Sequence, residues 1–262
     1  MYPSYPLPPT LVSRLNNYDW QPDKLGESGA HTFRLIGGNE PLFLKIADPS
    51  LAASLQAEAV RMEWLNGRLP VPQLLHFERT DEGAYLLMTT IPGVNTTHFN
   101  HRSDGEKEIA IRLLAEGLQQ LHNLPIDDCP FDHRLHRQLE KASQRMRCGL
   151  IDEADFDRER VGRKTADLYN ELLSTRPSHE DIVFTHGDYC LPNVMVLDNH
   201  LSGFIDLGNA GIADPYQDLA LCTRSLAYNF GSGWEDKFWS YYGLTSPDVA
   251  KLGFYRLLDE FF

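Results

Sequence analysis

The segment from residue 184 to residue 206 constrains the chain most, because two short apolar runs in it alternate with polar residues. It reads FTHGDYCLPN at 184–193 and ends in FID at 204–206. Residues 194–197 and 203–206 are predicted strands joined by the five residues 198–202. If Leu197 pairs with Gly203, Val194 lies opposite Asp206 and Asn193 lies beside that pair. The pattern therefore predicts a hairpin with polar side chains at its open end.

The polar residues of this segment suit one kind of chemistry. Asn193 and Asp206 can jointly offer oxygen ligands to a hard cation, and Asp188 lies on the loop that enters the hairpin. Phosphoryl transfer needs such ligands together with a carboxylate that accepts a proton from the attacking hydroxyl. The alternative, that these residues only form turns and caps, explains each of them singly but not their joint spacing.

A second set of residues lies nearer the N-terminus. Strand alternation in LFLKI at 42–46 places Phe43 and Lys45 on one face. The predicted helix that follows, 51–66, has a core stripe of Leu51, Leu55, Met62 and Leu65. Glu58 falls in this stripe, where a carboxylate is costly unless it is paired. We expect it to pair with Lys45, as in a phosphate-binding site; otherwise Glu58 lies at the solvated edge of the helix.

The order of predicted elements indicates an α+β fold with two lobes. Strands are predicted at 32–36, 42–46 and 85–89, with one helix between them. After Pro92-Gly93 the chain is mostly helical, for example at 106–121 and 165–173. We expect residues 1–93 to form a strand-rich N-terminal lobe and residues 94–262 a mainly helical C-terminal lobe. The small-residue turn GESGA at 26–30 is a candidate phosphate-covering element.

Composition narrows the classes of partner. The 24 Lys and Arg residues against 37 Asp and Glu give a net charge of −13, which argues against nucleic acid or an anionic membrane as the partner and suits a cationic ligand. Neither a signal peptide nor a membrane-spanning run is visible. The four cysteines form no CxxC pair, and we expect reduced, mostly buried thiols in a cytoplasmic protein.

These residues together resemble the aminoglycoside phosphotransferase family, whose fold is similar to that of protein kinases. The resemblance runs from about residue 19 to residue 262 and is strongest to the 3′-phosphotransferases of the kanamycin–neomycin type. Its matching stretches are HGDYCLPN at 186–193, DLG at 206–208, GIAD at 211–214, YQDLA at 216–220 and LLDEFF at 257–262.

The resemblance implies a role for each matching residue. Asp188 would be the catalytic base, Asn193 and Asp206 would be Mg²⁺ ligands, and Lys45 would bind the α- and β-phosphates of ATP with Glu58 orienting it. Nucleotide contacts would come from Ser28, Phe43 (stacked on the purine), Met88, Thr89 and Ile91. The substrate would be bound by Asp155, Asp157, Arg224, Asp259, Glu260 and Phe262. GTP stays open as the alternative donor.

The acidic residues have a physical argument of their own. An aminoglycoside is a polycation, so its pocket should be rich in carboxylates, each worth about 1.5–3 kcal/mol per charge-assisted contact. The patch DEADFDRE at 152–159 and the chain end offer them. Taken without the resemblance, the first patch is more readily explained as the exposed start of an acidic helix.

Three positions depart from the family pattern. Asn209 stands where the neomycin type usually has Arg, Arg158 where an acid is frequent, and Ser225 where an Asp is expected. They put the drug spectrum in doubt rather than phosphoryl transfer. We therefore expect an ATP- and Mg²⁺-dependent kinase that phosphorylates the 3′-hydroxyl of kanamycin- and neomycin-like antibiotics and so confers resistance.

Two other functions stay open. One is a kinase of the same fold that acts on another small alcohol, and no obligate protein partner is evident for either kinase. The other is a non-catalytic binding protein, which the intact set Lys45, Glu58, Asp188, Asn193 and Asp206 argues against.

Overall fold

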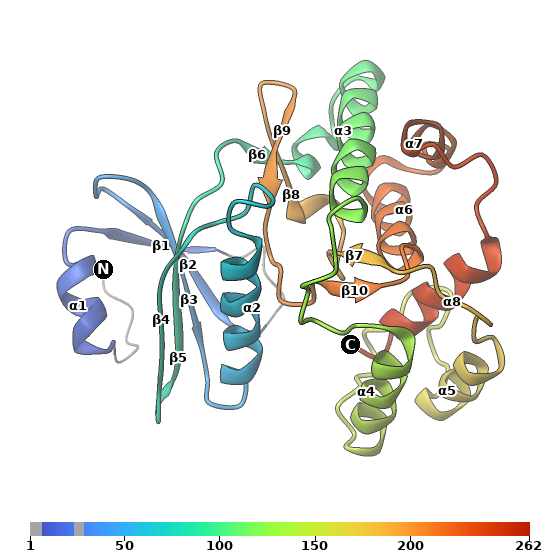
Figure 1. The fold of residues 1–262 in the computed structure, drawn as a ribbon, viewed down its shortest axis with the longest axis horizontal. Coiled ribbons are helices and arrows are strands. Elements are labelled where there is room, and N and C mark those ends of the chain that lie inside the picture. The colour runs from blue at the N-terminus through green and yellow to red at the C-terminus, as the bar shows by residue number, and fades with distance from the viewer. Residues whose placement is uncertain (1–6, 24–28) are drawn as a thin grey trace. The chain divides into compact units, whose positions relative to one another are not determined.

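The computed structural model describes residues 7–23 and 29–262 and divides into two compact units (Figure 1). The first unit comprises residues 1–94 with 195–197 and 202–208, and the second comprises 95–194, 198–201 and 209–262. The division into lobes at residue 93 stays a prediction. Ser28 and most of the GESGA turn lie outside the described residues.

The first unit is built on a five-stranded antiparallel sheet of order β1-β2-β3-β5-β4. Its strands are β1 (Asp19–Asp23), β2 (His31–Ile36), β3 (Leu42–Ala47), β4 (Leu74–Thr80) and β5 (Gly83–Thr89). The three strands expected from sequence are present, each within two residues of its predicted bounds. Successive side chains of β3 point to opposite faces of this sheet, with Leu42, Leu44 and Ile46 on one face.

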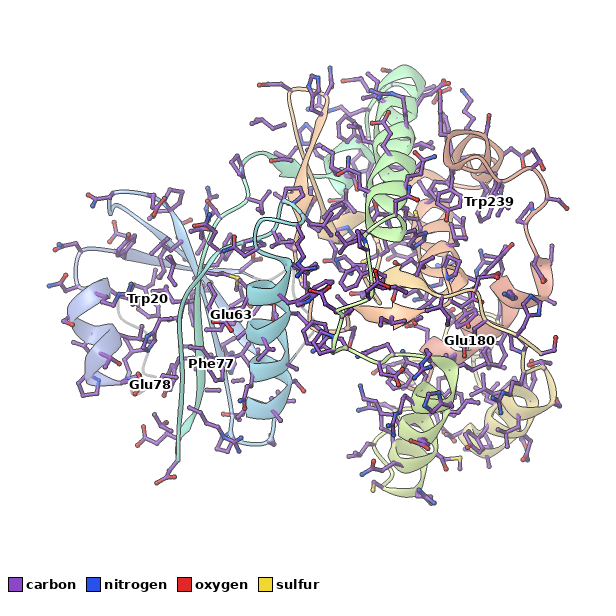
Figure 2. The ribbon with its side chains drawn as sticks, in the orientation of Figure 1. Trp20, Glu63, Phe77, Glu78, Glu180 and Trp239 are labelled. Carbon is purple, nitrogen blue, oxygen red and sulfur yellow. The ribbon has the colours of Figure 1, made fainter. Side chains whose placement is uncertain are left out.

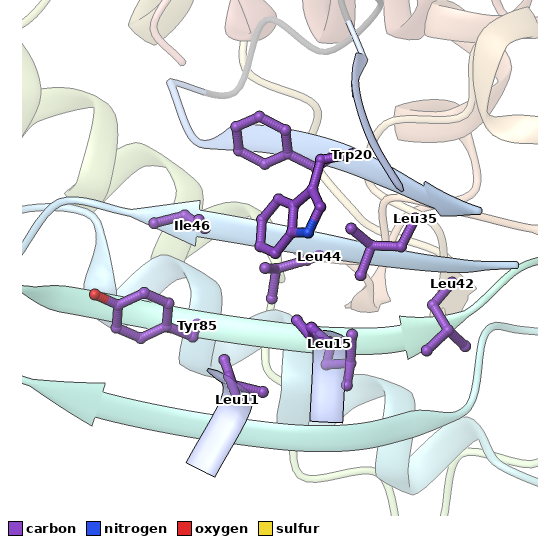
Figure 3. Close-up of a cluster of buried hydrophobic side chains, with 10 residues drawn as sticks. Leu11, Leu15, Trp20, Leu35, Leu42, Leu44, Ile46 and Tyr85 are labelled. Atoms are coloured by element: carbon purple, nitrogen blue, oxygen red, sulfur yellow. The ribbon is translucent and has the colours of Figure 1, made fainter. Parts of the chain in front are cut away.

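One face of the sheet is covered by helix α1 (Pro9–Leu15) (Figure 1). Leu11 and Leu15 of this helix pack on Leu42, Leu44 and other buried side chains of the sheet (Figure 3). No helix is predicted here from the sequence. Pro9 nevertheless suits the first helical position, where a backbone N–H has no partner to lose.

The opposite face carries Phe43 and Lys45 and is covered by helix α2 (Ala52–Leu65), which lies on the other side of the sheet from α1 (Figure 1). The predicted helix is confirmed. Of the predicted stripe, Leu55, Met62 and Leu65 are buried, together with Glu58. Leu51 is only half-buried, because it precedes the first helical residue.

The second unit is mainly helical. Its helices are η1 (Thr96–Phe99), α3 (Asp104–His122), α4 (Leu135–Arg147), α5 (Thr165–Ser174), η2 (Leu191–Asn193), α6 (Tyr216–Phe230), α7 (Glu235–Tyr242) and α8 (Val249–Asp259). Helix α3 begins two residues before its predicted start, because Ser103 and Glu106 form a capping box. Glu180 (Figure 2) accepts a hydrogen bond from the first backbone N–H of α4. The expected α+β class is confirmed.

Short strands form much of the segment from residue 183 to residue 213. Strand β7 (Val183–Thr185) pairs with β10 (Gly211–Ala213), while β6 (Val94–Asn95), β8 (Val194–Leu197) and β9 (His200–Phe204) form a three-stranded sheet. The predicted five-residue connection is wrong: only Asp198 and Asn199 separate β8 from β9. Both have positive φ, +50° and +59°, which suits a tight two-residue hairpin turn.

Two further expectations can be compared with the structure. None of the four cysteines, all of which are described, forms a disulfide, but the expectation that most are buried is wrong, since only Cys222 is buried and Cys148 is exposed. Among the described residues, no helix is long and apolar enough to cross a membrane.

Candidate active site

In the first unit, a buried ammonium group lies between two carboxylates. Lys45 Nζ is 2.8 and 2.9 Å from the two carboxylate oxygens of Glu58 and 3.2 Å from Asp206 Oδ1. Burial disfavours the charged ammonium, but the two carboxylates outweigh it and raise the pKa of Lys45. The predicted Lys45–Glu58 pair is therefore present, and Glu58 is not at a solvated edge.

Asp206 adopts an unusual backbone conformation, with φ of +61°. A non-glycine residue in this region costs about 1–3 kcal/mol, and such residues cluster at functional sites. Asp tolerates the conformation better than most residues because its short polar side chain can bond locally. Asp206 adopts this conformation two residues after the end of β9, where its carboxylate contacts Lys45.

The register of β3 and β5 determines where the residues predicted to contact adenine lie. Phe43 on β3 lies directly opposite Met88 on β5, and cross-strand partners share a face, so both lie on the face of Lys45. The N–H of Thr89 donates to the carbonyl of Gln73 at 3.0 Å. Thr89 Oγ1 accepts the N–H of Gln73 at 2.9 Å, so both the N–H and the hydroxyl of Thr89 already bond Gln73. Ile91 follows two residues later and is half-buried.

In the second unit, Asp188 and Asn193 are joined directly. Asn193 Nδ2 donates to the backbone carbonyl and to Oδ2 of Asp188, both at 2.9 Å. This use of the amide nitrogen leaves Asn193 Oδ1 as the atom that a cation would use. Gly187 has φ of +82°, and a Cβ there would lie 2.1 Å from the carbonyl oxygen of Asn209, so the loop requires glycine before Asp188.

A further carboxylate holds this loop from behind. Asp218 of α6 is fully buried and accepts hydrogen bonds from the backbone N–H groups of His186, at 2.7 Å, and Gly187, at 2.8 Å. Sequence reasoning quoted the YQDLA stretch but gave Asp218 no role. The available signal was a carboxylate among apolar residues of a helix, which has to be satisfied by donors.

Asp188 opens onto a pocket of about 250 Å³ in the second unit. Asp259 and Phe262, both predicted from the sequence to contact substrate, line this pocket together with Asp188. The remaining lining residues are Gln138, Lys141, Gly187, Asn209, Gln217, Leu221, Tyr255 and Leu258. A carboxylate and the candidate base thus share one cavity.

Four of the predicted substrate residues, Asp157, Arg224, Asp259 and Glu260, belong to one charge network. Arg224 bonds Asp157 at 3.2 Å and is also paired with Asp259. Arg160 bonds Glu260 at 3.0 Å and Asp157 at 3.4 Å. Three carboxylates thus face two guanidinium groups, a pairing that sequence reasoning missed for Arg160.

Burial affects the charges in this network. Burial raises the pKa of Glu260 to about 7, although the N–H of Asp157 and the guanidinium of Arg160 oppose the shift. Asp155 is exposed. The alternative that 152–159 begins a helix is wrong: residues 151–164 form turns and irregular loop, and α5 begins at Thr165.

Phe262, at the end of the chain, is held by α4. Arg145 Nε donates to the carbonyl oxygen of Phe261 at 2.7 Å, and its Nη2 donates to an oxygen of Phe262 at 3.0 Å. Lys141 lies 5.0 Å from the centre of the Phe262 ring. An oxygen that was expected to meet a substrate amine therefore already has a cationic partner.

Each unit offers one oxygen donor of the kind that Mg²⁺ takes: the Asp206 carboxylate in the first unit and Asn193 Oδ1 in the second. Within the described residues, no cluster of three or more His, Cys, Asp or Glu side chains could hold a metal. The chemistry of both donors suits the predicted cation, but neither alone would complete its coordination, and nucleotide phosphates and waters would have to supply further oxygen ligands.

Known proteins share this architecture and sequence. A model of the phosphotransferase enzyme family matches residues 19–255. An aminoglycoside 3′-phosphotransferase from Escherichia coli is 38% identical, covering 96% of this chain and 93% of the relative. A crystal structure of an aminoglycoside-3′-phosphotransferase of type VIII matches with a TM-score of 0.87 and 35% identity, covering 97% of each chain.

A third relative was solved with ligands. An aminoglycoside phosphotransferase from Streptomyces rimosus, in complex with ADP and streptomycin, matches with a TM-score of 0.83 and 28% identity over 96% of this chain and 95% of its own. The resemblance seen in the sequence motifs is thereby confirmed. The chain belongs to the phosphotransferase enzyme family.

Proposed function

We propose that this phosphotransferase is an aminoglycoside 3′-phosphotransferase, which transfers the γ-phosphate of ATP to the 3′-hydroxyl of kanamycin- and neomycin-type antibiotics and thereby confers resistance. Relatives with that name align over nearly the whole chain. The observation that carries the proposal is the pocket in which Asp188 and Asp259 lie together. A polycationic sugar can place an ammonium against one carboxylate and a hydroxyl against the other.

In this proposal Asp188 accepts the proton of the attacking hydroxyl. Its Oδ2 receives a hydrogen bond from Asn193, which fixes the orientation of the carboxylate. Orientation of this kind contributes to rate because it holds the reacting groups near attack geometry before the chemical step.

Lys45 would bind the α- and β-phosphates, with Glu58 orienting the ammonium, and the purine would lie against Phe43 and Met88. Asn193 and Asp206 would hold Mg²⁺, which when bound neutralises charge on the phosphate oxygens. Ser28 would touch a phosphate, and Thr89 and Ile91 would offer backbone groups to the base. GTP remains the alternative donor.

The charge network supports a cationic substrate of restricted shape. The carboxylates of Asp157, Asp259 and Glu260 exceed the guanidinium groups of Arg160 and Arg224 by one negative charge when all are ionised. Asp155 and Phe262 lie nearby in the sequence of the same two segments. Asn209 replaces a positive charge of the family pattern, and Arg158 and Ser225 replace negative ones, so we expect a drug range that is either narrowed or retuned.

The proposal is tested by ADP release with purified protein and a panel of 2-deoxystreptamine drugs. We expect ATP- and Mg²⁺-dependent turnover of kanamycin and none of tobramycin, which lacks the 3′-hydroxyl. Equal turnover of both would contradict the assigned position of transfer. Turnover of another small alcohol, with no drug accepted, would favour the alternative kinase function.

The role of Asp188 is tested separately with Asp188→Ala. This variant should bind ATP with unchanged affinity and lose at least about 100-fold in kcat, because proton transfer contributes factors of about 10²–10⁴. Asp167→Ala, an exposed carboxylate in the first turn of α5, is the matched control and should keep wild-type turnover. An undiminished kcat in Asp188→Ala would remove the proposed base.

A further inference from the structure

Three side chains form a row behind the loop that carries Asp188: those of Asp218 and His122 are buried, and Tyr242 is half-buried. Tyr242 Oη lies 2.8 Å from His122 Nδ1, and His122 Nε2 lies 3.3 Å from Asp218 Oδ2. Asp218 in turn accepts the backbone N–H groups of His186 and Gly187. The row therefore runs from the end of α7, through the end of α3, to the residues just before Asp188.

The direction of donation along the row is fixed by chemistry. The Asp218 carboxylate only accepts hydrogen bonds, so His122 must carry its proton on Nε2 to bond it. In the neutral imidazole His122 Nδ1 is then an acceptor, and it receives the hydroxyl of Tyr242. Burial and the nearby Asp218 charge raise the pKa of Tyr242 to about 12, which keeps that hydroxyl protonated as a donor. The proton position on each side chain thus determines whether the next one donates or accepts.

Contacts between α3 and α7 also restrain the His122 ring. Gln119 Nε2 donates to the carbonyl oxygens of Tyr241 and Tyr242, at 3.2 and 3.1 Å, and so joins the end of α3 to the end of α7. The rings of His122 and Tyr242 meet edge to face, with centroids 5.8 Å apart. A ring held on two sides presents its Nε2–H to Asp218 in one orientation.

We propose that His122 and Tyr242 are positioning residues for phosphoryl transfer: they orient Asp218, which holds the His186 and Gly187 amides and thereby sets the direction of the Asp188 carboxylate. The inference rests on the proposed function of Asp188. Neither residue touches substrate in this scheme. Their loss should therefore lower kcat and leave the KM of both substrates nearly unchanged, because a small misplacement of a catalytic group costs rate rather than binding.

The test uses graded variants at both positions. His122→Leu removes both hydrogen bonds and should lower kcat about 10- to 100-fold, by analogy with other residues that orient a reacting group. His122→Gln retains an N–H donor for Asp218 and should recover most of the rate. Tyr242→Phe should lower kcat severalfold, and adding it to His122→Leu should cause no further loss, because Tyr242 acts through His122.

Tyr241→Phe is the matched control. It removes a hydroxyl from the neighbouring residue of α7, where Tyr241 Oη donates to Glu108 at 2.9 Å, away from the row. Its kcat should equal that of the wild type. Additive losses in the double variant, or an equal loss in Tyr241→Phe, would show a general structural effect and overturn the proposal.

A second readout does not depend on the substrate. Amide hydrogen exchange at His186 and Gly187 should accelerate in His122→Leu and in Tyr242→Phe, and not in Tyr241→Phe, at equal global stability. This holds even where no aminoglycoside is turned over, so a failure of the proposed function is distinguishable from a failure of the row. If His122→Leu does not fold, Tyr242→Phe carries the same measurement, and exchange in His122→Gln should stay near that of the wild type. Unchanged exchange and unchanged kcat would overturn the proposal.

Discussion

At the scale of single residues, the proposed phosphate binding by Lys45 can be separated by mutation from its place in a buried ion pair. Its side chain is 11% exposed and that of Glu58 is 8% exposed, so the pair is buried. Lys45→Met removes the cationic partner of the buried Glu58 carboxylate and should destabilise the protein by about 3–5 kcal/mol, whereas Lys45→Met with Glu58→Leu should recover much of this. Urea denaturation of both variants, compared with the wild type, measures the difference.

Activity should respond differently from stability. The double variant still lacks the ammonium proposed for the phosphates, so its KM for ATP should stay high, with the KM for kanamycin little changed. A double variant that regains stability and also wild-type nucleotide affinity would show that Lys45 serves only the fold. One that regains neither would show that the pair is more than an isolated charge contact.

At the scale of elements, the two-residue turn between β8 and β9 depends on the left-handed backbone conformation of Asp198 and Asn199. The left-handed backbone of Asn199 costs most residues about 1–2 kcal/mol, and glycine avoids that cost. Asn199→Ala should therefore lower the free energy of unfolding by about 1 kcal/mol, and Asn199→Gly should equal or exceed the wild type. Urea denaturation of the three proteins checks the order.

The exposed Asn66 provides the matched comparison, because its φ is −58°. There glycine gains nothing from its freedom and should be the less stable of the two replacements. The same order of stabilities at both positions would mean that the left-handed conformation of Asn199 does not determine the outcome.

The elements also show why some features could be predicted and others not. Strand alternation placed Phe43 and Lys45 on one face, and the helix pattern of 52–65 placed Glu58 against Lys45, because both depend on local periodicity. The hairpin connection was misjudged, since a two-residue turn without glycine gives little sign of itself in the sequence. Helix α1 was missed because its stability comes from burying Leu11 and Leu15 on a sheet formed by later residues.

Contacts between distant segments were beyond sequence reasoning. The bond from His122 to Asp218 joins residues 96 positions apart, and that from Arg160 to Glu260 joins residues 100 positions apart. No spacing rule connects such residues; packing alone brings them together. The catalytic motif could be recognised, but the groups that orient it could not.

At the scale of the whole molecule, the net charge of −13 should act on the two substrates in opposite directions. A polycationic drug is attracted and an anionic nucleotide is repelled, and both effects weaken as the screening length falls from about 30 Å at 0.01 M salt to about 8 Å at 0.15 M. Over this range kcat/KM for kanamycin should fall severalfold, while kcat/KM for ATP should rise or stay level.

The measurement is a titration with NaCl at constant Mg²⁺, with the melting temperature followed in parallel to confirm that the fold is unchanged. Parallel falls for both substrates would point to a general loss of activity in salt, and they would remove the electrostatic argument for a cationic substrate.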